Sequence, residues 1–367
     1  MRDKILAFIR ENDLIVPGST LVCAVSGGKD SVCLLHVMLS LQEQLQITVE
    51  AAHLNHQLRA EESDRDEAFV KSFCQSLGVP LTVSRADVSG RCKKTGESTE
   101  EAARALRYAF FDRLGKPVAT AHTQDDNMET VLLNLVRGTA LRGLCGIPPR
   151  RGNLIRPMLP VSRIEVEQYL TENKLPHVED STNASDFALR NRLRHEVLPI
   201  LKRENPNLGE TVFHMSGVLR REDRYLDEQA ASLLHSCRIP SGGWSCRALQ
   251  DAPEVLRARA VRKLLEAWEI AKPSYAHVQA LLRLISQTEG SASVTLPGGK
   301  TVRRSYDALD LAQERPERFE PVFLAPDCEV QLPAQELRIS CRFVKKYEKS
   351  MQSLCTFAFK YDTIDEI

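Results

Sequence analysis

Apolar and polar positions follow two alternating periods up to about residue 200. Short apolar runs, typical of buried strands, are each followed by a longer stretch with apolar residues three and four apart, typical of helices. This alternation predicts an α/β domain with a doubly wound, mostly parallel sheet. The predicted strands are residues 20–25, 48–54, 80–84 and 117–121, and the predicted helices are residues 31–42, 63–77, 99–114 and 126–137.

The pattern changes after Pro199. Residues 209–229 are predicted to form one long polar helix, and residues 248–286 contain further helices without strands between them. The sequence then alternates around Pro297-Gly298-Gly299, which predicts a β-hairpin over residues 291–311, and short strand-like pieces follow in residues 323–367. We therefore expect three domains, which are a catalytic domain at 1–205, a helical second domain at 206–315, and the start of a C-terminal domain, apparently shortened, at 316–367.

Composition agrees with several soluble domains. A chain of 367 residues is longer than one ordinary core supports. The chain lacks a run of about 18 apolar residues and begins with a charged helical pattern instead of a secretion signal, so we expect a cytoplasmic protein without a membrane partner. The ten cysteines include no Cys-x-x-Cys pair, which favours reduced core thiols over disulfides or zinc sites.

The loop after the first predicted strand carries the clearest chemical signal. Residues 26–31 read Ser-Gly-Gly-Lys-Asp-Ser and open the next helix. Adjacent glycines allow positive φ and a close approach of backbone N–H groups to an anion, and the helix N-terminus adds unpaired donors. The Walker pattern does not fit, because Asp30 follows Lys29 and no glycine lies five residues before Gly28. We predict a phosphate-binding loop with Asp30 as a magnesium ligand, and a plain glycine turn is the alternative.

Arginines gather in two later segments although the chain has 49 basic and 49 acidic residues. Residues 137–163 contain no Asp or Glu and are rich in glycine and proline, and a second basic group follows at 190–203. A charge run is most often a solvated face, but here it accompanies a phosphate loop, so we favour a polyanionic substrate. The candidate RNA-binding residues are Arg137, Arg142, Arg150, Arg151, Arg190 and Arg192.

The segment after the fourth predicted strand collects a histidine and three acids. His122 is followed by Asp125, Asp126 and Glu129, and the last two share one helix face. Two carboxylates one turn apart beside a phosphate loop can bind magnesium through water or hold an ammonium group. The alternative is ordinary capping of a helix N-terminus by acids.

The roles of Arg104 and of the arginines at 190–194 each have two possible interpretations. Arg104, on the helix predicted at 99–114, has either a functional role or a surface ion pair with Glu100. The sequence Asp-Ser-Thr-Asn at 180–183 precedes the basic segment 190–194, in a helix that Leu198-Pro199 is expected to close. Arginines in this segment can stack on bases or hold phosphates, and a basic helix that only decorates the surface is the alternative.

Together these segments resemble the tRNA(Ile)-lysidine synthase family of PP-loop ATP pyrophosphatases. The resemblance implies an enzyme that uses ATP and Mg²⁺ to adenylate the C2 oxygen of the wobble cytidine in the CAU anticodon of isoleucine tRNA, with release of pyrophosphate. Free L-lysine then displaces AMP to give lysidine. The matching segments follow the family's order over nearly the whole chain, at residues 26–31, 55–59, 100–111, 122–138, 156–157, 180–199, 296–299 and 302–304.

The resemblance also implies roles for residues and domains. Domain 1–205 is then the PP-loop ATP-binding domain and domain 206–315 binds tRNA. Asp126 and Glu129 would hold the lysine ammonium, and the ATP phosphates would bind to Ser26, Gly27, Gly28, Lys29, Asp30 and Ser31, with Asp30 on Mg²⁺. The implied catalytic residues are Asp30, Arg104, His122, Asp126, Glu129 and Arg194, among which the arginines steady phosphate or the cytidine and His122 lines the pocket. A homodimer is left open.

Three other readings compete with this one. A tRNA 2-thiolation enzyme shares the loop, but needs paired or nucleophilic cysteines, whereas Cys145 has no partner in sequence. Amide-forming ligases do not need the arginine-rich segment, and an RNA-binding module with a decayed site would be expected to lose its acids. Asn55 stands where many relatives have Asp, which weakens any acid or metal role there.

Overall fold

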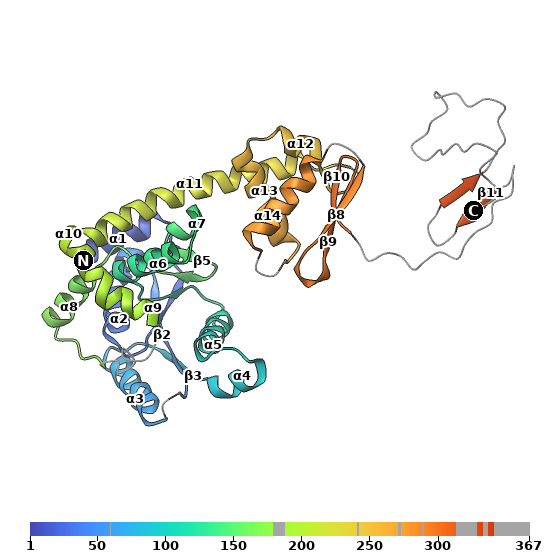
Figure 1. The fold of residues 1–367 in the computed structure, drawn as a ribbon. Coiled ribbons are helices and arrows are strands. Elements are labelled where there is room, and N and C mark those ends of the chain that lie inside the picture. Colours follow the sequence, from blue (N-terminus) through green and yellow to red (C-terminus); the bar gives the residue numbers. More distant parts are fainter. Residues whose placement is uncertain are drawn as a thin grey trace, which may run out of the picture. The chain divides into compact units, whose positions relative to one another are not determined.

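The computed structural model describes residues 1–58, 60–178, 188–240, 242–270, 273–287, 290–312, 329–332 and 337–340. The chain forms two compact units, one of Met1–Arg238 with Ala248–Glu266 and the other of Ile239–Arg247 with Ala267–Ile367 (Figure 1). The domain boundaries expected near residues 205 and 315 stay predictions. The Asp-Ser-Thr-Asn motif at 180–183 and most of the segment 316–367 lie outside the described residues.

A six-stranded sheet forms the centre of the first unit. Its strand order is β3-β2-β1-β4-β6-β5, and all neighbours are parallel except the antiparallel pair β5 and β6. The predicted doubly wound, mostly parallel sheet is therefore confirmed. The strands are β1 (Thr20–Ala24), β2 (Thr48–Asn55), β3 (Leu81–Arg85), β4 (Val118–Ala119), β5 (Arg150–Arg151) and β6 (Leu154–Ile155). The sequence did not predict β5 and β6, because they lie in a segment rich in arginine, glycine and proline that has no apolar run, whereas the equally short β4 lies in the apolar run 117–121.

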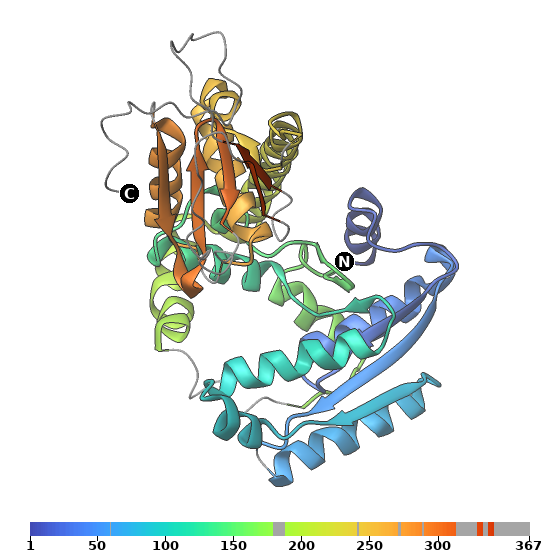
Figure 2. The same cartoon turned by 90° about the vertical axis from the view of Figure 1, so that its right-hand side faces the viewer.

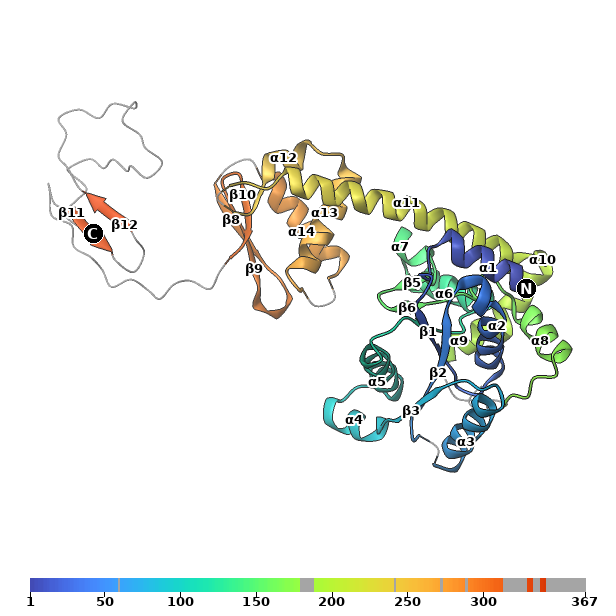
Figure 3. The ribbon, with the colours of Figure 1, turned by 180° about the vertical axis from the view of Figure 1, so that it is seen from behind.

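Helices cover both faces of this sheet (Figure 3). The larger buried cluster contains side chains of α1 (Arg2–Glu11), α2 (Lys29–Leu45), α3 (Ala60–Ser76) and α8 (Arg163–Glu172). On the opposite face, Phe110 and Phe111 of α5 (Thr99–Arg113) pack against Val22 and Val118, and α4 (Val88–Thr95) packs on α5. Helix α6 (Gln124–Val136) begins shortly after β4.

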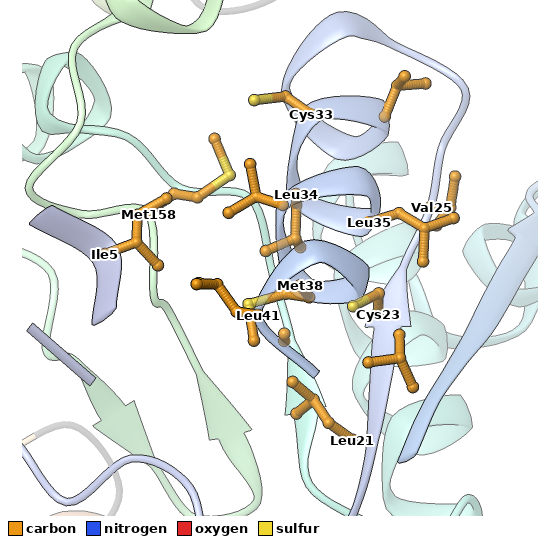
Figure 4. Close-up of a cluster of buried hydrophobic side chains, with 14 of the residues drawn as sticks. Ile5, Leu21, Cys23, Val25, Cys33, Leu34, Leu35, Met38, Leu41 and Met158 are labelled. Atoms are coloured by element: carbon orange, nitrogen blue, oxygen red, sulfur yellow. The ribbon is translucent and has the colours of Figure 1, made fainter. Parts of the chain in front are cut away.

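The core fixes α2, and α2 begins at the phosphate loop. Figure 4 shows Leu34 of α2 toward Met158, and Leu35 toward Val25 at the end of β1. Leu34, Leu35 and Met38 are fully buried. Burial of one such side chain contributes about 1.5–3 kcal/mol, so this packing holds the N-terminus of α2 in a defined position.

Residues 188–204 form one nearly continuous helical segment. It consists of α9 (Ala188–Arg192), a π-helical turn at Leu193–Val197, and α10 (Leu198–Glu204). The expectation that Leu198-Pro199 closes the helix was wrong. Pro199 has no N–H to donate to the carbonyl four residues earlier, and Leu198 donates to Leu193, five residues back, so the turn widens and the helix continues.

The long helix α11 (Leu208–Ser236) confirms the polar helix expected at 209–229. It packs against α6 and against the short α7 (Leu141–Leu144). Arg259 of α13 (Glu254–Ala267) bridges Asp223 and Asp227 of α11 with N–O distances of 2.7 Å each. Among the described helices, none is long and apolar enough to cross a membrane.

The second unit contains an antiparallel sheet in the order β7-β10-β9-β8. The hairpin expected around Pro297-Gly298-Gly299 is confirmed, because β8 (Ser291–Thr295) pairs with β9 (Thr301–Ser305). Helix α14 (Tyr275–Ser286) packs on these strands, as Figure 2 shows. This unit also contains β7 (Trp244–Ser245), β10 (Ala308–Leu311), and the pair β11 (Glu329–Leu332) and β12 (Leu337–Ser340). Helix α12 (Cys246–Asp251) begins in the second unit, and its residues from Ala248 onward belong to the first.

Candidate functional site

A cavity of about 1450 Å³ lies at the carboxyl ends of β1, β2 and β4. Its described lining includes residues that follow these three strands, together with residues of α5, α8 and α9. Strand order reverses between β1 and β4, which is where open α/β sheets bind ligands. The cavity exceeds the roughly 300–1,000 Å³ of a typical small-ligand site, so it has room for a nucleotide and a second substrate.

The glycine loop turns into α2 through one left-handed residue. Gly27 has φ +97°, and a Cβ there would lie 3.3 Å from Phe69. Gly28, with φ −73° and ψ 161°, is the N-cap of α2, so the expectation of positive φ holds for Gly27 and fails for Gly28. Ser31 closes the loop, because its Oγ donates to the Gly28 carbonyl at 2.8 Å and accepts from the Ser26 N–H at 3.1 Å.

Asp30 has the features of a ligand for a cation. Its Oδ1 is buried and has no hydrogen-bond partner among the described residues. Burial, and then the nearby carboxylate of Asp126, raise the pKa of Asp30 to about 6. In the described part of the chain, no three His, Cys, Asp or Glu side chains form a metal cage. Mg²⁺ is commonly held by one or two carboxylates plus substrate phosphates, so Asp30 in this loop fits that ion.

The three acidic residues of α6 all accept hydrogen bonds from Arg163, the first residue of α8. Asp125 accepts from the Arg163 backbone N–H at 2.8 Å, Asp126 from Nη2 at 3.0 Å, and Glu129 from Nη1 at 3.2 Å. Asp126 and Glu129 therefore share a face, as their spacing indicates. Burial raises the pKa of Asp126, but Arg163 and the hydrogen bonds from Thr123 outweigh burial and hold it below the usual range. The sequence alone did not mark Arg163 as a site residue.

Glu129 is surrounded by guanidinium groups. Its side chain is 1% exposed, and it is not among the described residues that line the cavity. Arg194 donates to both carboxylate oxygens at 2.7 and 2.8 Å, and Arg190 donates through Nε at 3.0 Å. With Arg163, three arginines share this one carboxylate, while all three also line the cavity.

Helix α5 places a basic and aromatic group on another wall of the cavity. The Arg104 guanidinium lies 5.0 Å from the ring centre of Tyr108 and donates to its hydroxyl at 2.9 Å. His122 also lines the cavity, and its Nδ1 pairs with the Thr120 hydroxyl at 3.0 Å. Burial, opposed by Asp126 and assisted by Arg156, lowers the pKa of His122 to about 4, so its ring is neutral at pH 7.

Arg156 and Tyr108 are further lining residues that the sequence did not assign. Arg156 is 4% exposed, and its Nη1 donates to the Pro148 carbonyl at 2.7 Å. Its buried Nε has no partner among the described residues. A buried donor without a partner is costly, so such a group in a cavity wall is a candidate contact for an anion or a carbonyl.

The six candidate RNA-binding arginines have different surroundings in the structure, and their role in RNA binding stays a prediction. Of these six, Arg190 lines the cavity, and Arg137 and Arg192 are exposed. Arg142 pairs with Glu266 at 2.8 Å, while Arg150 donates to the Asp13 carbonyl at 3.0 Å, which is a structural contact. The remaining one, Arg151, lies 5.8 Å from the ring centre of Tyr108.

Asn55 is engaged in a structural network. Its Nδ2 donates to Glu67 at 2.9 Å, and its Oδ1 accepts from the Gln57 N–H at 2.9 Å. Glu67 is 3% exposed and also accepts from Lys71 and Arg85. The buried amide thus orders the loop after β2 and supplies no acid.

Comparison with known proteins agrees with this geometry. A family model described as the PP-loop domain matches residues 1–201, and one described as the TilS substrate binding domain matches residues 245–309. The tRNA(Ile)-lysidine synthase of Geobacillus kaustophilus is 36% identical over 322 residues, which cover 84% of this chain and 69% of the relative. This chain belongs to the tRNA(Ile)-lysidine synthase family.

Other lysidine synthase relatives extend the match. The tRNA(Ile)-lysidine synthase of Geobacter sulfurreducens is 36% identical, with 84% of this chain and 68% of the relative covered. The bifunctional protein TilS/HprT of Listeria innocua is 34% identical, and there 84% of this chain spans half of the relative. Within the family, the cavity at the phosphate loop is the candidate active site.

Proposed function

We propose that this chain joins free L-lysine to C2 of the wobble cytidine in the CAU anticodon of isoleucine tRNA. ATP first adenylates the C2 oxygen and pyrophosphate leaves; the lysine amine then attacks C2 and AMP leaves, which gives lysidine. The observation that carries the proposal is that the phosphate loop, Asp30 and Asp126 line one cavity in a member of the lysidine synthase family. A homodimer remains a prediction.

The loop at residues 26–31 is suited to the nucleotide phosphates. Gly28, Lys29 and Asp30 at the N-terminus of α2 line the cavity, and the first N–H groups of a helix have no intrahelical acceptor. A Cβ at Gly28 would meet only the Ser26 Oγ, at 3.7 Å, so the backbone there is open to a close approach. Lys29, which pairs with Glu167 of α8, is near enough to the loop to neutralise phosphate charge. Asp30 would hold Mg²⁺, which stabilises negative charge on the phosphates during transfer.

Asp126 is the acid best placed for the substrate lysine. It lines the cavity, and its side chain is 16% exposed, whereas Glu129 is closed off by arginines. A carboxylate with free lone pairs can orient an ammonium group next to the activated carbon. His122, neutral at pH 7, and Arg104 complete the polar lining and are suited to contacts with the cytidine or its phosphate.

Thiolation is not favoured. Sulfur transfer needs a thiolate, and none of the described residues lining the cavity is a cysteine. Cys145, in the arginine-rich loop, is buried, and burial raises the pKa of its thiol. A protonated, buried thiol is a poor nucleophile.

The test uses the full chain with ATP, Mg²⁺, labelled lysine and an isoleucine tRNA transcript with a CAU anticodon. We expect label in the RNA and one pyrophosphate released per lysine incorporated. Methionine tRNA, which carries the same anticodon, is the matched control substrate and is expected to remain unlabelled. Pyrophosphate release without lysine incorporation would show a different nucleophile and would overturn the proposal.

The Asp30→Asn variant tests the site itself. It preserves size and removes the charge that would hold Mg²⁺, so pyrophosphate release is expected to fall by two orders of magnitude or more. The Asp126→Asn variant should raise the KM for lysine more than the KM for ATP. If both variants kept normal activity, the reaction would take place elsewhere.

A further inference from the structure

Glu129 cannot accept a substrate cation without losing an arginine. Each of its carboxylate oxygens already accepts two hydrogen bonds, from Arg163 and Arg194 on one and from Arg190 and Arg194 on the other. Its 1% exposure leaves no open approach from the cavity. Three positive groups around one carboxylate would also repel an incoming ammonium. The resemblance implied that Glu129 holds lysine, and this geometry points to another role.

The three arginines, which we call the arginine cluster (Arg163, Arg190 and Arg194), have donors to spare. Among contacts of the described residues, Arg190 uses Nε alone, Arg194 uses Nε and Nη2, and Arg163 uses both Nη groups. Their side chains are 25%, 35% and 25% exposed for Arg163, Arg190 and Arg194, and all three line the cavity. The remaining N–H groups are therefore available to a ligand there.

The unused N–H groups select an anion. The three guanidinium groups face the carboxylates of Asp126 and Glu129, and Asp30 also lies near Arg163, so the site is defined by its spare donors and not by a net charge. Asp125, the other acid of this turn, is paired with Lys202 at 2.9 Å. Guanidinium groups are planar forks that match phosphate oxygens, and a fixed fork binds more strongly because less side-chain entropy is lost.

We propose that the arginine cluster is a phosphate-binding site, and that Glu129 is a positioning residue that holds the three guanidinium groups in place. This proposal adds a binding site to the proposed function. It depends on that function only in the question of which substrate supplies the phosphate. That source is either the polyphosphate of the nucleotide or a phosphodiester of the RNA. Arg163 lines the same cavity as Lys29 and Asp30 of the phosphate loop, which favours the polyphosphate.

The first experiment measures binding of inorganic pyrophosphate to the full chain by calorimetry, without RNA or lysine. In Arg190→Gln and Glu129→Gln we expect the Kd for pyrophosphate to rise about tenfold or more. Glu129→Gln keeps the shape of the side chain and removes the charge that aligns the arginines. Arg10→Gln, on an exposed position of α1, is the matched control and should change the Kd less than twofold. Circular dichroism verifies that each variant is folded.

The second experiment separates the two sources of phosphate and the two roles of Glu129. If pyrophosphate binding is unchanged but both variants bind tRNA about tenfold more weakly, the site stands and its phosphate belongs to RNA. If neither ligand binds more weakly, the site is wrong. If Glu129→Gln raises the KM for lysine and leaves phosphate binding intact, Glu129 is a lysine ligand and the positioning role is overturned. A loss of pyrophosphate affinity in a chain that makes no lysidine would support the site while the proposed function fails.

Discussion

Arg194 holds both carboxylate oxygens of Glu129, with Nε 2.7 Å from one oxygen and Nη2 2.8 Å from the other. The pair joins α6 to the π-helical turn at Leu193–Val197, and Glu129 is almost entirely buried. A buried carboxylate is tolerated where it is fully hydrogen-bonded by positive groups, and here three arginines supply those bonds. The ion pairs at Glu129 therefore help to hold the segment of Arg190 and Arg194 against α6.

Arg194→Ala should lower the free energy of unfolding by about 2 kcal/mol. Removal of one partner of a buried pair costs about 3–5 kcal/mol, and Arg163 and Arg190 offset part of that loss. Urea denaturation measures the change. The matched control is Arg142→Ala, because the Arg142–Glu266 pair is exposed and should contribute less than about 1 kcal/mol. Equal effects of the two substitutions would contradict the burial argument.

Gly27→Ala and Gly28→Ala should differ although the two residues are adjacent. Gly27 has φ +97°, and a Cβ would lie 3.3 Å from Phe69, so alanine should cost about 1–2 kcal/mol or more. At Gly28 φ is −73° and the nearest atom to a Cβ is the Ser26 Oγ at 3.7 Å, so alanine should fold with a loss below about 1 kcal/mol. Thermal unfolding of both variants tests this order, and the reverse order would refute the loop geometry.

The network around Glu67 should make stability depend on acid pH. Hydrogen bonds from Arg85, Lys71 and Asn55 lower the pKa of Glu67 to about 2 from an ordinary value of 4.5. A lowered carboxylate pKa stabilises the fold above the ordinary pKa, and this contribution disappears as pH falls from about 4.5 to about 2. After allowance for solvent screening, we expect the free energy of unfolding of the wild type to exceed that of Glu67→Gln by about 1 kcal/mol at pH 6. The difference should be smaller at pH 3. A difference that does not depend on pH would exclude Glu67 as the cause.

Substitution of Arg150 and of Arg137 should have different effects, because Arg150 has a structural contact and Arg137 is a candidate for RNA binding. Arg150 donates to the Asp13 carbonyl, so Arg150→Ala should lower the melting temperature with little effect on RNA binding. Arg137 is exposed at the C-terminus of α6. If it neutralises one phosphate, Arg137→Ala should reduce the slope of log affinity against log salt by about 0.7–0.9. Filter binding at several salt concentrations measures both slopes, and an unchanged slope for Arg137→Ala removes it from the RNA surface.

The local sequence was sufficient to predict most of the long secondary-structure elements and the parallel sheet. Periodicity predicted the parallel sheet, the long helix α11 and the hairpin of β8 and β9, because an apolar face repeats within a single element. The backbone of the loop at residues 26–31 was predicted at Gly27, which has positive φ, and not at Gly28; the binding of phosphate by this loop stays a prediction. The short strands β5 and β6 were missed because their arginine- and glycine-rich surroundings contain no apolar run, unlike those of the equally short β4.

The sequence by itself determined the α/β architecture, the phosphate loop and the presence of acids and arginines. The tertiary structure alone decided which of them meet, because α6, α8 and α9 are distant in sequence and converge only through packing. It placed Arg163, Arg190 and Arg194 around Glu129, and it turned Arg150 toward the backbone of Asp13. Helix periodicity identifies the face on which a charge lies, but the partner of that charge depends on the neighbouring element across the interface.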